Sequence, residues 1–401
     1  MSTWKEYRFS EMLIDESISY GIVQPGAHTE TNSVPIIRVN NIRNGNINTN
    51  AVLKVASSIE VKYQRTRLSG GELLITVVGS VGECAIVPTT LAGWNVARAV
   101  SVARIKENFD KRFIKYAFKT EDVIFQMYGN TNDTVQPTLN LSSLKGIKFN
   151  LPPLPEQKAI ASVLSSLDDK IDLLHRQNKI LEAMAETLFR QWFVEDAQEG
   201  WEENPLSFFG EIICGKTPSK KIHSYFNGKI PFIKIPDMHG NIFLFETADS
   251  LTKEGKQFQA NKTLPPKSIC VSCIATVGLV SINAKESQTN QQINSIIPQK
   301  DYYRYFLYLT MKSYNDLLHS MASGGTATLN LNTGNFSKIP VPYPGDKFLV
   351  DFQVQVEPFF DKIFTNQAQI RTLEKLRDTL LPKLMSGEVR VKGGKLTHYE
   401  N

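Results

Sequence analysis

An internal repeat constrains this fold more than any other feature of the sequence. The segment VPIIRVNNI begins at Val34, and IPFIKIPDM begins at Ile230, 196 positions later. The same spacing separates LSGGELLITVVGSVG, which begins at Leu68, from LPPKSICVSCIATVG, which begins at Leu264. The chain is therefore predicted to contain one unit of about 195 residues twice, with small insertions.

Shorter matches extend this repeat. TLNL occurs at 138–141 and again at 328–331, a difference of 190, and Asp-Lys-Ile occurs at 169–171 and 361–363, a difference of 192. Each copy is thus predicted to run from a β-rich part into a helical part.

The two parts differ in periodicity. Short runs such as PIIRV, ELLITVV and SICVSCI lie between Gly, Asn and Pro breakers, which is typical of a compact β-containing domain. The helical part of each copy has apolar residues at alternating spacings of four and three, as in a coiled coil. These seam positions are Ile160, Leu164, Leu167, Ile171, Leu174, Asn178, Leu181, Ala185, Leu188 and Trp192 in the first copy, and Phe352, Val356, Phe359, Ile363, Asn366, Ile370, Leu373, Arg377, Leu380 and Leu384 in the second.

We expect an α+β fold with four regions. Two similar, mixed β-rich domains with short helices would occupy 1–150 and 198–345, and two long helices would occupy 151–197 and 346–401, the latter with a C-terminal tail. Antiparallel pairing of the helices would give the chain an internal pseudo-two-fold axis. Basic side chains outnumber acidic ones in both β-rich regions, which suggests contact with a polyanion at two places, although ordinary solvated lysines explain the charge equally well.

Composition and hydropathy indicate a cytoplasmic protein that does not enter a membrane. At 401 residues and 41% hydrophobic, the chain can bury two cores. Four cysteines without a paired framework indicate a reducing compartment. The longest mostly apolar run, residues 269–282, is too short and interrupted to span a bilayer.

The segment NLPPLPEQ at residues 150–157 resembles a broken version of the Asn-Pro-Pro-aromatic loop of DNA amino-methyltransferases. The second copy has VPYPGD instead, and no glycine-rich cofactor loop accompanies either segment. Proline is tolerated before a helix or in its first turn. We therefore interpret the segment as a rigid joint that leads into the first long helix.

Several longer stretches resemble a known family. The run LPPLPEQKAIASVLSSLDDKIDLLHRQNKILEAMAETLFRQWF and the closing LRDTLLPKLMSGEVRV are similar to the two conserved regions of specificity subunits of Type I restriction-modification systems. ITVVGSVG, SCIATVG and NQQINSI at residues 290–296 resemble motifs of their target recognition domains. At the spacing of 196, NQQINSI aligns with WNVARAV at residues 94–100 of the first copy, so the two copies differ in this segment.

The resemblance implies a non-enzymatic subunit whose two domains each read half of a bipartite site in double-stranded DNA. Modification (methyltransferase) subunits, two per chain, and restriction (endonuclease and translocase) subunits would be its partners. No cofactor is expected in this chain, because S-adenosylmethionine, ATP and Mg would belong to the partner subunits. The helices would act as the spacer: residues 155–192 would span about 57 Å if wholly helical, which exceeds the roughly 34 to 36 Å of one DNA turn.

Candidate DNA contacts are basic or amide residues beside the matched strands. Lysines would hold phosphates, whereas arginines and amides could read base edges. The candidates are Arg38, Lys62, Arg65, Arg67 and Arg98 in the first copy, and Lys234, Lys253, Lys256, Lys262, Asn290, Gln291 and Gln292 in the second.

The helices carry two further sets of candidates. Asn178 and Asn366 interrupt the seams and are expected to set the register by facing each other, unless each faces solvent or a partner. Apolar residues near the helix ends are candidates for docking partner subunits or for burial between the helices. They are Phe189, Trp192, Phe193, Leu380, Leu381 and Leu384.

Two patterns suggest other functions. Asp237, Glu254 and Lys256 imitate the PD…ExK set of a metal-dependent DNA nuclease, but the first copy has no such set. Cys270 and Cys273 form a CxxC without a second pair in a strand pattern, which favours core packing over zinc. A coiled-coil scaffold that binds only protein is a further alternative, but it leaves the basic β-rich regions unexplained.

Overall fold

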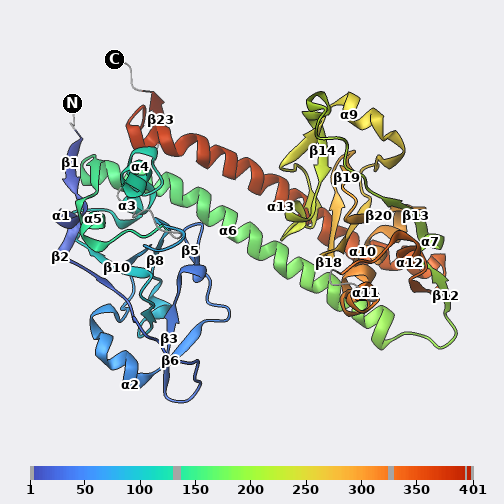
Figure 1. Cartoon of the computed structure of the whole chain (residues 1–401), viewed down its shortest axis with the longest axis horizontal. Helices are drawn as coiled ribbons and strands as arrows, with labels where there is room; N and C mark the ends of the chain where they lie inside the picture. The colour runs from blue at the N-terminus through green and yellow to red at the C-terminus, as the bar shows by residue number, and fades with distance from the viewer. Residues whose placement is uncertain (1–3, 130–136, 324–328, 393–394, 399–401) are drawn as a thin grey trace. The chain divides into compact units, whose positions relative to one another are not determined.

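The computed structural model describes residues 4–129, 137–323, 329–392 and 395–398. The chain forms two compact units, one made of Met1–Lys170 with Leu373–Asn401 and the other of Ile171–Thr372. Each unit therefore combines one β-rich domain with part of both long helices (Figure 1). Among the described residues, no helix is long and apolar enough to cross a membrane.

The β-rich domain of the first unit contains an antiparallel four-stranded sheet. Its order is β2 (Leu13–Tyr20), β10 (Val100–Ile105), β7 (Leu73–Thr76) and β8 (Cys84–Ile86). Both faces of this sheet are covered, because Leu73 and Ile75 join one apolar cluster while Leu74, between them, joins another.

Smaller elements complete the first unit. A second sheet has β3 (Ser33–Ile37) between β6 (Leu53–Ala56), which is antiparallel to it, and β9 (Asn95–Val96), which is parallel to it. The other strands form three pairs: β1 (Lys5–Arg8) with β11 (Lys148–Leu151), β4 (Ile42–Arg43) with β5 (Asn46–Ile47), and β22 (Val389–Lys392) with β23 (Lys395–His398). The short helices are α1 (Phe9–Met12), η1 (Val39–Asn41), α2 (Ser57–Glu60), η2 (Val61–Thr66), η3 (Thr89–Leu91), α3 (Lys111–Ala117), α4 (Glu121–Gly129) and α5 (Leu141–Gly146).

The second unit repeats this plan. Its larger sheet has the order β13 (Gly210–Cys214), β20 (Ile293–Pro298), β17 (Ile269–Ile274), β18 (Thr276–Asn283) and β15 (Phe243–Leu244). Its smaller sheet places β14 (Phe226–Ile233) between antiparallel β16 (Asp249–Leu251) and parallel β19 (Gln288–Thr289). Its other strands, β12 (Glu202–Pro205) and β21 (Pro340–Tyr343), pair with each other. The short helices are η4 (Gln191–Glu195), α7 (Leu206–Phe209), η5 (His223–Tyr225), α8 (Ile235–Met238), α9 (Lys253–Phe258), η6 (Ala260–Lys262), η7 (Asp301–Tyr303), α10 (Arg304–Ser313), α11 (Asn315–Ala322) and α12 (Thr333–Ser337).

The TLNL match between the copies is wrong by two residues. The Leu139 N–H donates to Val77 O at 2.9 Å, and the equivalent bond in the second unit runs from Leu331 N–H to Cys273 O at 2.8 Å. The structural difference is therefore 192 rather than 190. The second copy reads TLNLNT, so its Leu-Asn pair occurs twice, and the sequence match used the earlier pair at 329–330. Thr328, the first residue of that match, lies outside the described residues.

Asparagine capping explains why this segment repeats. The Asn140 side chain accepts the Ser143 N–H and caps α5, and the Asn332 side chain accepts the Asn335 N–H and caps α12. Each side chain satisfies a backbone donor that a helix start leaves without an intrahelical partner.

The NLPPLPEQ segment is a joint, as interpreted from the sequence. Asn150 lies in β11, and α6 (Leu154–Arg190) begins directly after Pro153. The buried Gln157 in the first turn donates to Pro152 O at 2.8 Å and accepts the Asp110 N–H at 2.9 Å. These bonds fasten the start of the helix to the domain that precedes it.

The long helices α6 and α13 (Asp346–Ser386) pair antiparallel within each unit. In the second unit Asn178 bonds to Asn366, and Phe189 packs against Phe352 with ring centroids 6.2 Å apart. In the first unit Arg377 binds Asp168 at 3.0 Å. The apolar seam residues are buried or half-buried, as the spacing of four and three predicts.

Candidate nucleic-acid interface and helix pair

Parallel strands bring several predicted residues to one edge of the first domain. Strand β3 ends at Ile37 and its neighbour β9 ends at Val96, and these two residues are partners in register. The Ala97 N–H then donates to Ile37 O at 2.9 Å. Arg38 and Arg98 follow these strand ends, so the edge combines two of the predicted contacts.

The second domain builds the same edge with different side chains. Ile233 and Thr289 are the last register partners of β14 and β19, and the Asn290 N–H donates to Ile233 O at 3.1 Å. Lys234 and Gln291 lie directly beyond these strand ends. Two predicted residues of this domain therefore meet at the edge equivalent to that of Arg38 and Arg98.

Backbone hydrogen bonds assign Gln291 as the counterpart of Arg98. Ala97 O and Ala99 O accept the N–H groups of Val100 and Val77, whereas Asn290 O and Gln292 O accept those of Ile293 and Cys273. Ala97 thus corresponds to Asn290 and Ala99 to Gln292. The alignment of WNVARAV with NQQINSI was wrong, because the structural counterpart of NVARAV is QTNQQI, with a difference of 193.

A glycine lets a third chain segment reach this edge in each domain. The Ile22 N–H donates to Val96 O at 2.7 Å, and the Lys216 N–H donates to Thr289 O at 2.9 Å. A Cβ on the preceding Gly21 would lie 2.1 Å from Val96 O, and one on Gly215 would lie 2.2 Å from Asn290 O. Glycine is thus required at both positions because the neighbouring backbone lies too close for a side chain, and not because the residue has a positive φ.

Arg38 and Lys234 are equivalent, as the repeat predicted. Each precedes a one-turn helix and donates its backbone N–H to a side chain three residues on, Asn41 at 2.9 Å and Asp237 at 2.8 Å. The Lys234 ammonium also forms an ion pair with Asp249. Lys234 is therefore engaged within its own domain.

Arg67 is held by a buried carboxylate. Its Nε donates to Glu60 Oε1 at 2.9 Å, and a second guanidinium nitrogen binds Oε2. Glu60 is only 1% exposed, and it also accepts the Asn95 amide at 2.9 Å. The Arg67 bonds are the main reason why the pKa of Glu60 lies below its usual value. This points to a structural role for Arg67, whereas Lys62 and Arg65 on η2 have exposed side chains.

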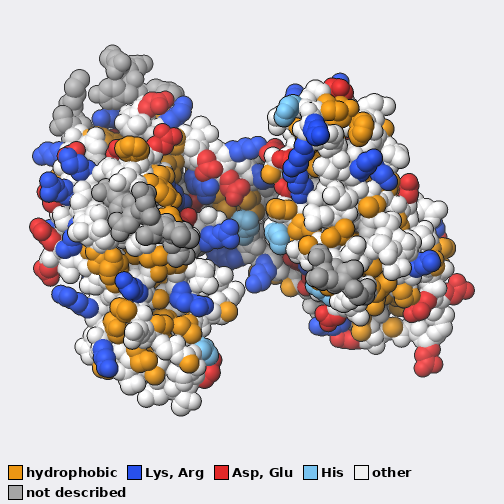
Figure 2. Space-filling model, viewed as in Figure 1, with side chains coloured by type: hydrophobic (Ala, Val, Ile, Leu, Met, Phe, Trp, Pro, Cys, Tyr) orange, Lys and Arg blue, Asp and Glu red, His pale blue; other side chains and the backbone are white. Residues whose placement is uncertain are grey.

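The other three predicted lysines of the second domain lie on a separate short segment, α9 and η6. Lys253 is exposed at the start of α9, Lys256 pairs with Glu286 at 2.6 Å, and Lys262 is half-buried in η6. Figure 2 shows basic side chains gathered over the part of the second unit that holds α9 and β14.

The three amides after β19 have different environments. Asn290 is buried and donates to Gln292 Oε1 at 2.9 Å. Gln291 is exposed, and its Oε1 accepts the Thr217 hydroxyl at 2.7 Å. Of the three predicted amides, Gln291 is therefore the one presented to a ligand.

Sequence reasoning missed the loop that carries Thr217. Residues 215–222 read GKTPSKKI, and Lys216, Lys220 and Lys221 are all exposed. A hydrogen bond from Gln259 to Lys216 O at 2.7 Å helps to fix the loop. Three lysines within six residues were a sequence signal for a DNA contact. The loop was missed because the candidates were chosen beside strands that match between the copies, and this loop is not beside one.

The nuclease alternative receives no support from the structure. Asp237 accepts the N–H groups of Lys234 and Ala248, and it occupies the helix-capping position that Asn41 has in the first domain. Lys256 is paired with Glu286. No group of three or more His, Cys, Asp or Glu side chains in the described parts of the chain could hold a metal ion.

The CxxC cysteines are core residues, as the strand pattern predicted. Cys270 and Cys273 are at most 1% exposed, and they belong to different apolar clusters. Burial raises the pKa of each thiol to about 12, so both stay protonated at neutral pH.

Equivalent tyrosines fasten the two domains to α6. In the first unit the Tyr116 hydroxyl donates to Asp168 at 2.6 Å, and in the second the Tyr308 hydroxyl donates to Glu182 at 3.1 Å. Burial, together with the neighbouring carboxylate, raises the pKa of both tyrosines. The two positions are 192 residues apart, which matches the repeat.

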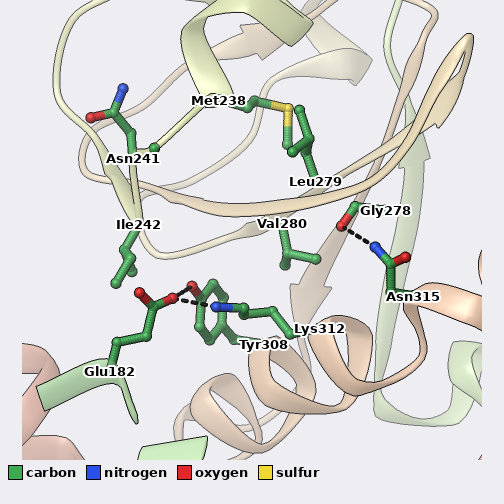
Figure 3. Close-up of a pocket in the computed structure, with 11 residues that line it drawn as sticks. Glu182, Met238, Asn241, Ile242, Gly278, Leu279, Val280, Tyr308, Lys312 and Asn315 are labelled. Atoms are coloured by element: carbon green, nitrogen blue, oxygen red, sulfur yellow. Dashed lines mark hydrogen bonds and ion pairs between the residues drawn. The ribbon is translucent and has the colours of Figure 1, made fainter. Parts of the chain in front are cut away.

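A recess of about 300 Å³ lies beside this contact in the second unit. Figure 3 shows Tyr308 and Lys312 of α10 converging on Glu182, with Met238 and Leu279 on the opposite wall. The Lys312 ammonium also binds Glu186 at 2.6 Å. The polar groups of the recess thus hold the domain against α6.

The expected docking residues at the helix ends are largely internal. Phe189, Phe193 and Leu384 are 6%, 7% and 0% exposed and belong to the apolar cores of the units. Trp192, Leu380 and Leu381 are half-buried against the same cores. Of the two alternatives left open by the sequence, the structure favours burial, because each helix end packs beneath a β-rich domain.

A different apolar stripe is exposed on α6. Leu173, Ile180 and Met184 are 40%, 61% and 45% exposed. Their spacings of seven and four place them on one face of the helix. The seam toward α13 uses other positions, so this face is available to a partner.

Comparison with known proteins agrees with the duplicated architecture. The family model for the Type I restriction modification DNA specificity domain matches residues 1–183 and 198–374. The chain is 36% identical to the Type I restriction enzyme HindI specificity subunit of Haemophilus influenzae, covering 66% of this chain and 74% of that protein. It is 27% identical to the MjaIX specificity subunit of Methanocaldococcus jannaschii, covering 80% and 78%.

A solved structure shares the fold. The crystal structure of a Type I restriction-modification S subunit from M. genitalium matches with a TM-score of 0.62 and 16% identity, covering 95% of this chain and 96% of that one. The repeat, the paired helices and the family match agree: this chain belongs to the specificity subunits of Type I restriction-modification systems.

Proposed function

We propose that each β-rich domain reads one half of a bipartite site in double-stranded DNA and that the helix pair sets the spacing of the halves. The observation that carries this proposal is the strand-end edge, which both domains build with the same backbone bonds but with different exposed side chains, Arg98 and Gln291. The same backbone arrangement with a different exposed side chain in each domain suits recognition of two different sequences.

The chain itself performs no chemistry in this proposal. Modification subunits, two per chain, would methylate, and restriction subunits would cleave and translocate. S-adenosylmethionine, ATP and Mg would be bound by those partners, and the complex would work in the cytoplasm. The polar groups of the domains serve capping, domain attachment and DNA contact, which is consistent with a recognition role.

The exposed stripe on α6 is the proposed docking surface for a modification subunit. Leu173, Ile180 and Met184 present apolar side chains that neither the seam nor the domain covers. A polar helix face interrupted by three large apolar groups suits a protein partner.

The test is to mix the purified chain with its modification subunit and a DNA library. We expect methyl transfer and a bipartite footprint only when both proteins are present. Methylation or cleavage by the chain alone would contradict the non-catalytic role, and so would a full-affinity bipartite footprint that the modification subunit left unchanged.

A further inference from the structure

Residues 98 and 291 are the same structural position with two different side chains. The residues on either side correspond through their backbone hydrogen bonds, so the assignment does not depend on sequence similarity. We propose that this position determines one base pair in each half-site, with Arg98 reading a guanine and Gln291 reading an adenine. The inference rests on the proposed function and adds the chemistry of recognition to it.

The surroundings of Arg98 leave its guanidinium available. Its backbone is held by a hydrogen bond from its own N–H to Ile22 O at 2.9 Å. Its side chain is exposed and forms no ion pair with any residue that the structure describes. Its neighbours Ala97 and Ala99 have no hydrogen-bonding side chains, so Arg98 is the only polar group on this three-residue tip.

The surroundings of Gln291 orient its amide. The Thr217 hydroxyl donates to Oε1, which identifies that atom as the acceptor and Nε2 as the donor. Oε1 keeps a second lone pair, and no acceptor for Nε2 is found within the described part of the chain. Its neighbours Asn290 and Gln292 bind each other, so their amides do not compete for the same base.

These two side chains have different partners in the DNA major groove. An arginine fork matches guanine O6 and N7, which both accept hydrogen bonds. A glutamine amide matches adenine, because N7 accepts from Nε2 while the N6 amino group donates to Oε1. Each bidentate match is worth about five- to 150-fold in preference over a wrong base.

The alternative role for both residues is a phosphate contact. A phosphate contact adds affinity on every sequence and carries no base preference. Lysine in place of arginine separates the two roles, since it retains the charge but loses the planar fork.

The experiment is methylation-motif sequencing of cells that carry the whole complex with wild-type chain, Arg98→Lys, Arg98→Gln or Gln291→Arg. We expect Arg98→Lys to lose a preference of at least about fivefold for one G·C pair in one half-site. Arg98→Gln should shift that pair toward A·T, and Gln291→Arg should shift one A·T pair of the other half-site toward G·C. Thermal unfolding of each purified variant would show that the domain remains folded.

Lys62→Gln is the matched control, because it removes an exposed charge from the same domain. It should lower methylation of all sites evenly and leave the motif unchanged. An unchanged motif in Arg98→Lys, or changes in both half-sites, would overturn the base assignment. Exchange of residues 1–150 with those of a related subunit, followed by the same sequencing, distinguishes failure of the base assignment from failure of the proposed function. If the exchange changes a half-site and Arg98→Lys does not, only the base assignment fails.

Discussion

Asn366 Nδ2 donates a hydrogen bond of 2.9 Å to Asn178 Oδ1 in the seam between α6 and α13. Both side chains are buried, at 0% and 8% exposure, at positions of the apolar seam. This bond forms only in one register, because a shift of either helix would place an amide against a leucine or isoleucine of the seam. We infer that this pair fixes the register of the spacer at some cost in stability.

Replacing both asparagines tests that inference. Asn178→Leu with Asn366→Leu should raise the free energy of unfolding, whereas Asn178→Leu alone should lower it by about 1–3 kcal/mol because the Asn366 amide loses its partner. The double variant should also methylate sites with more than one spacer length. Denaturant unfolding and motif sequencing measure the two effects, and an unchanged melting point and spacer in the double variant would argue against a register role.

Arg67 and Lys62 should separate structural from DNA-binding charges. Arg67→Ala leaves the buried Glu60 carboxylate with the Asn95 amide as its remaining side-chain partner, so the free energy of unfolding should fall by about 1–3 kcal/mol. Lys62→Ala should leave stability within about 0.5 kcal/mol and weaken DNA binding evenly across sequences. Equal stability of the two variants would show that the Glu60 pair contributes nothing.

The same ion pair predicts a pH dependence. The pKa of Glu60 is lowered in the folded chain, chiefly by Arg67, so its stabilisation is present above the unfolded pKa of about 4.3 and is lost as the pH falls through the lower folded value. The difference in unfolding free energy between wild type and Arg67→Ala should therefore be largest near neutral pH and shrink below about pH 4. A constant difference from pH 7 to pH 3 would exclude the ionised carboxylate as its origin.

Replacing the tyrosines that hold the domains to α6 should lower the free energy of unfolding and leave the DNA sequence that is methylated unchanged. Tyr308→Phe removes one hydrogen bond to Glu182, which keeps its ion pair with Lys312, and the expected loss is about 1–2 kcal/mol. Tyr116→Phe should have a similar effect in the first unit. Motif sequencing should show unchanged half-sites for both variants, and an altered half-site would mean that these residues do more than hold the domains.

The docking proposal is tested by replacing one exposed and one buried apolar residue of α6. Ile180→Asp should weaken binding of the modification subunit at least about tenfold with little change in thermal unfolding, because its side chain is 61% exposed. Phe189→Ala should instead destabilise the second unit by about 3–5 kcal/mol, since the ring is buried. Binding measured by titration calorimetry would contradict the proposal if Ile180→Asp bound like wild type.

The sequence predicted the duplication, the helix pair and the facing asparagines because these depend on periodicity. Apolar spacing of four and three defines one face of a helix, and a polar residue on that face must find a polar partner. The equivalence of Arg38 and Lys234 followed from a constant spacing of 196 across a region without insertions.

Contacts that depend on tertiary packing could not be read from the sequence. The partnership of Arg67 with Glu60 requires η2 to turn back on α2, and the correspondence of Arg98 with Gln291 is hidden by a change of spacing from 196 to 193. The sequence could not choose between docking and burial for the residues at the helix ends, because an apolar residue on a helix looks the same whether a partner or its own domain covers it.

The central claim is that this chain chooses the methylated sequence, one half-site per domain. The most direct measurement is motif sequencing of genomic DNA from cells that contain the modification subunit with no specificity chain, with this chain, or with this chain after exchange of residues 1–150 for the matching domain of a related subunit. We predict no motif without the chain, one bipartite motif with it, and a change confined to one half-site after the exchange. A motif that appears without the chain, or an exchange that alters both half-sites or neither, would contradict the account.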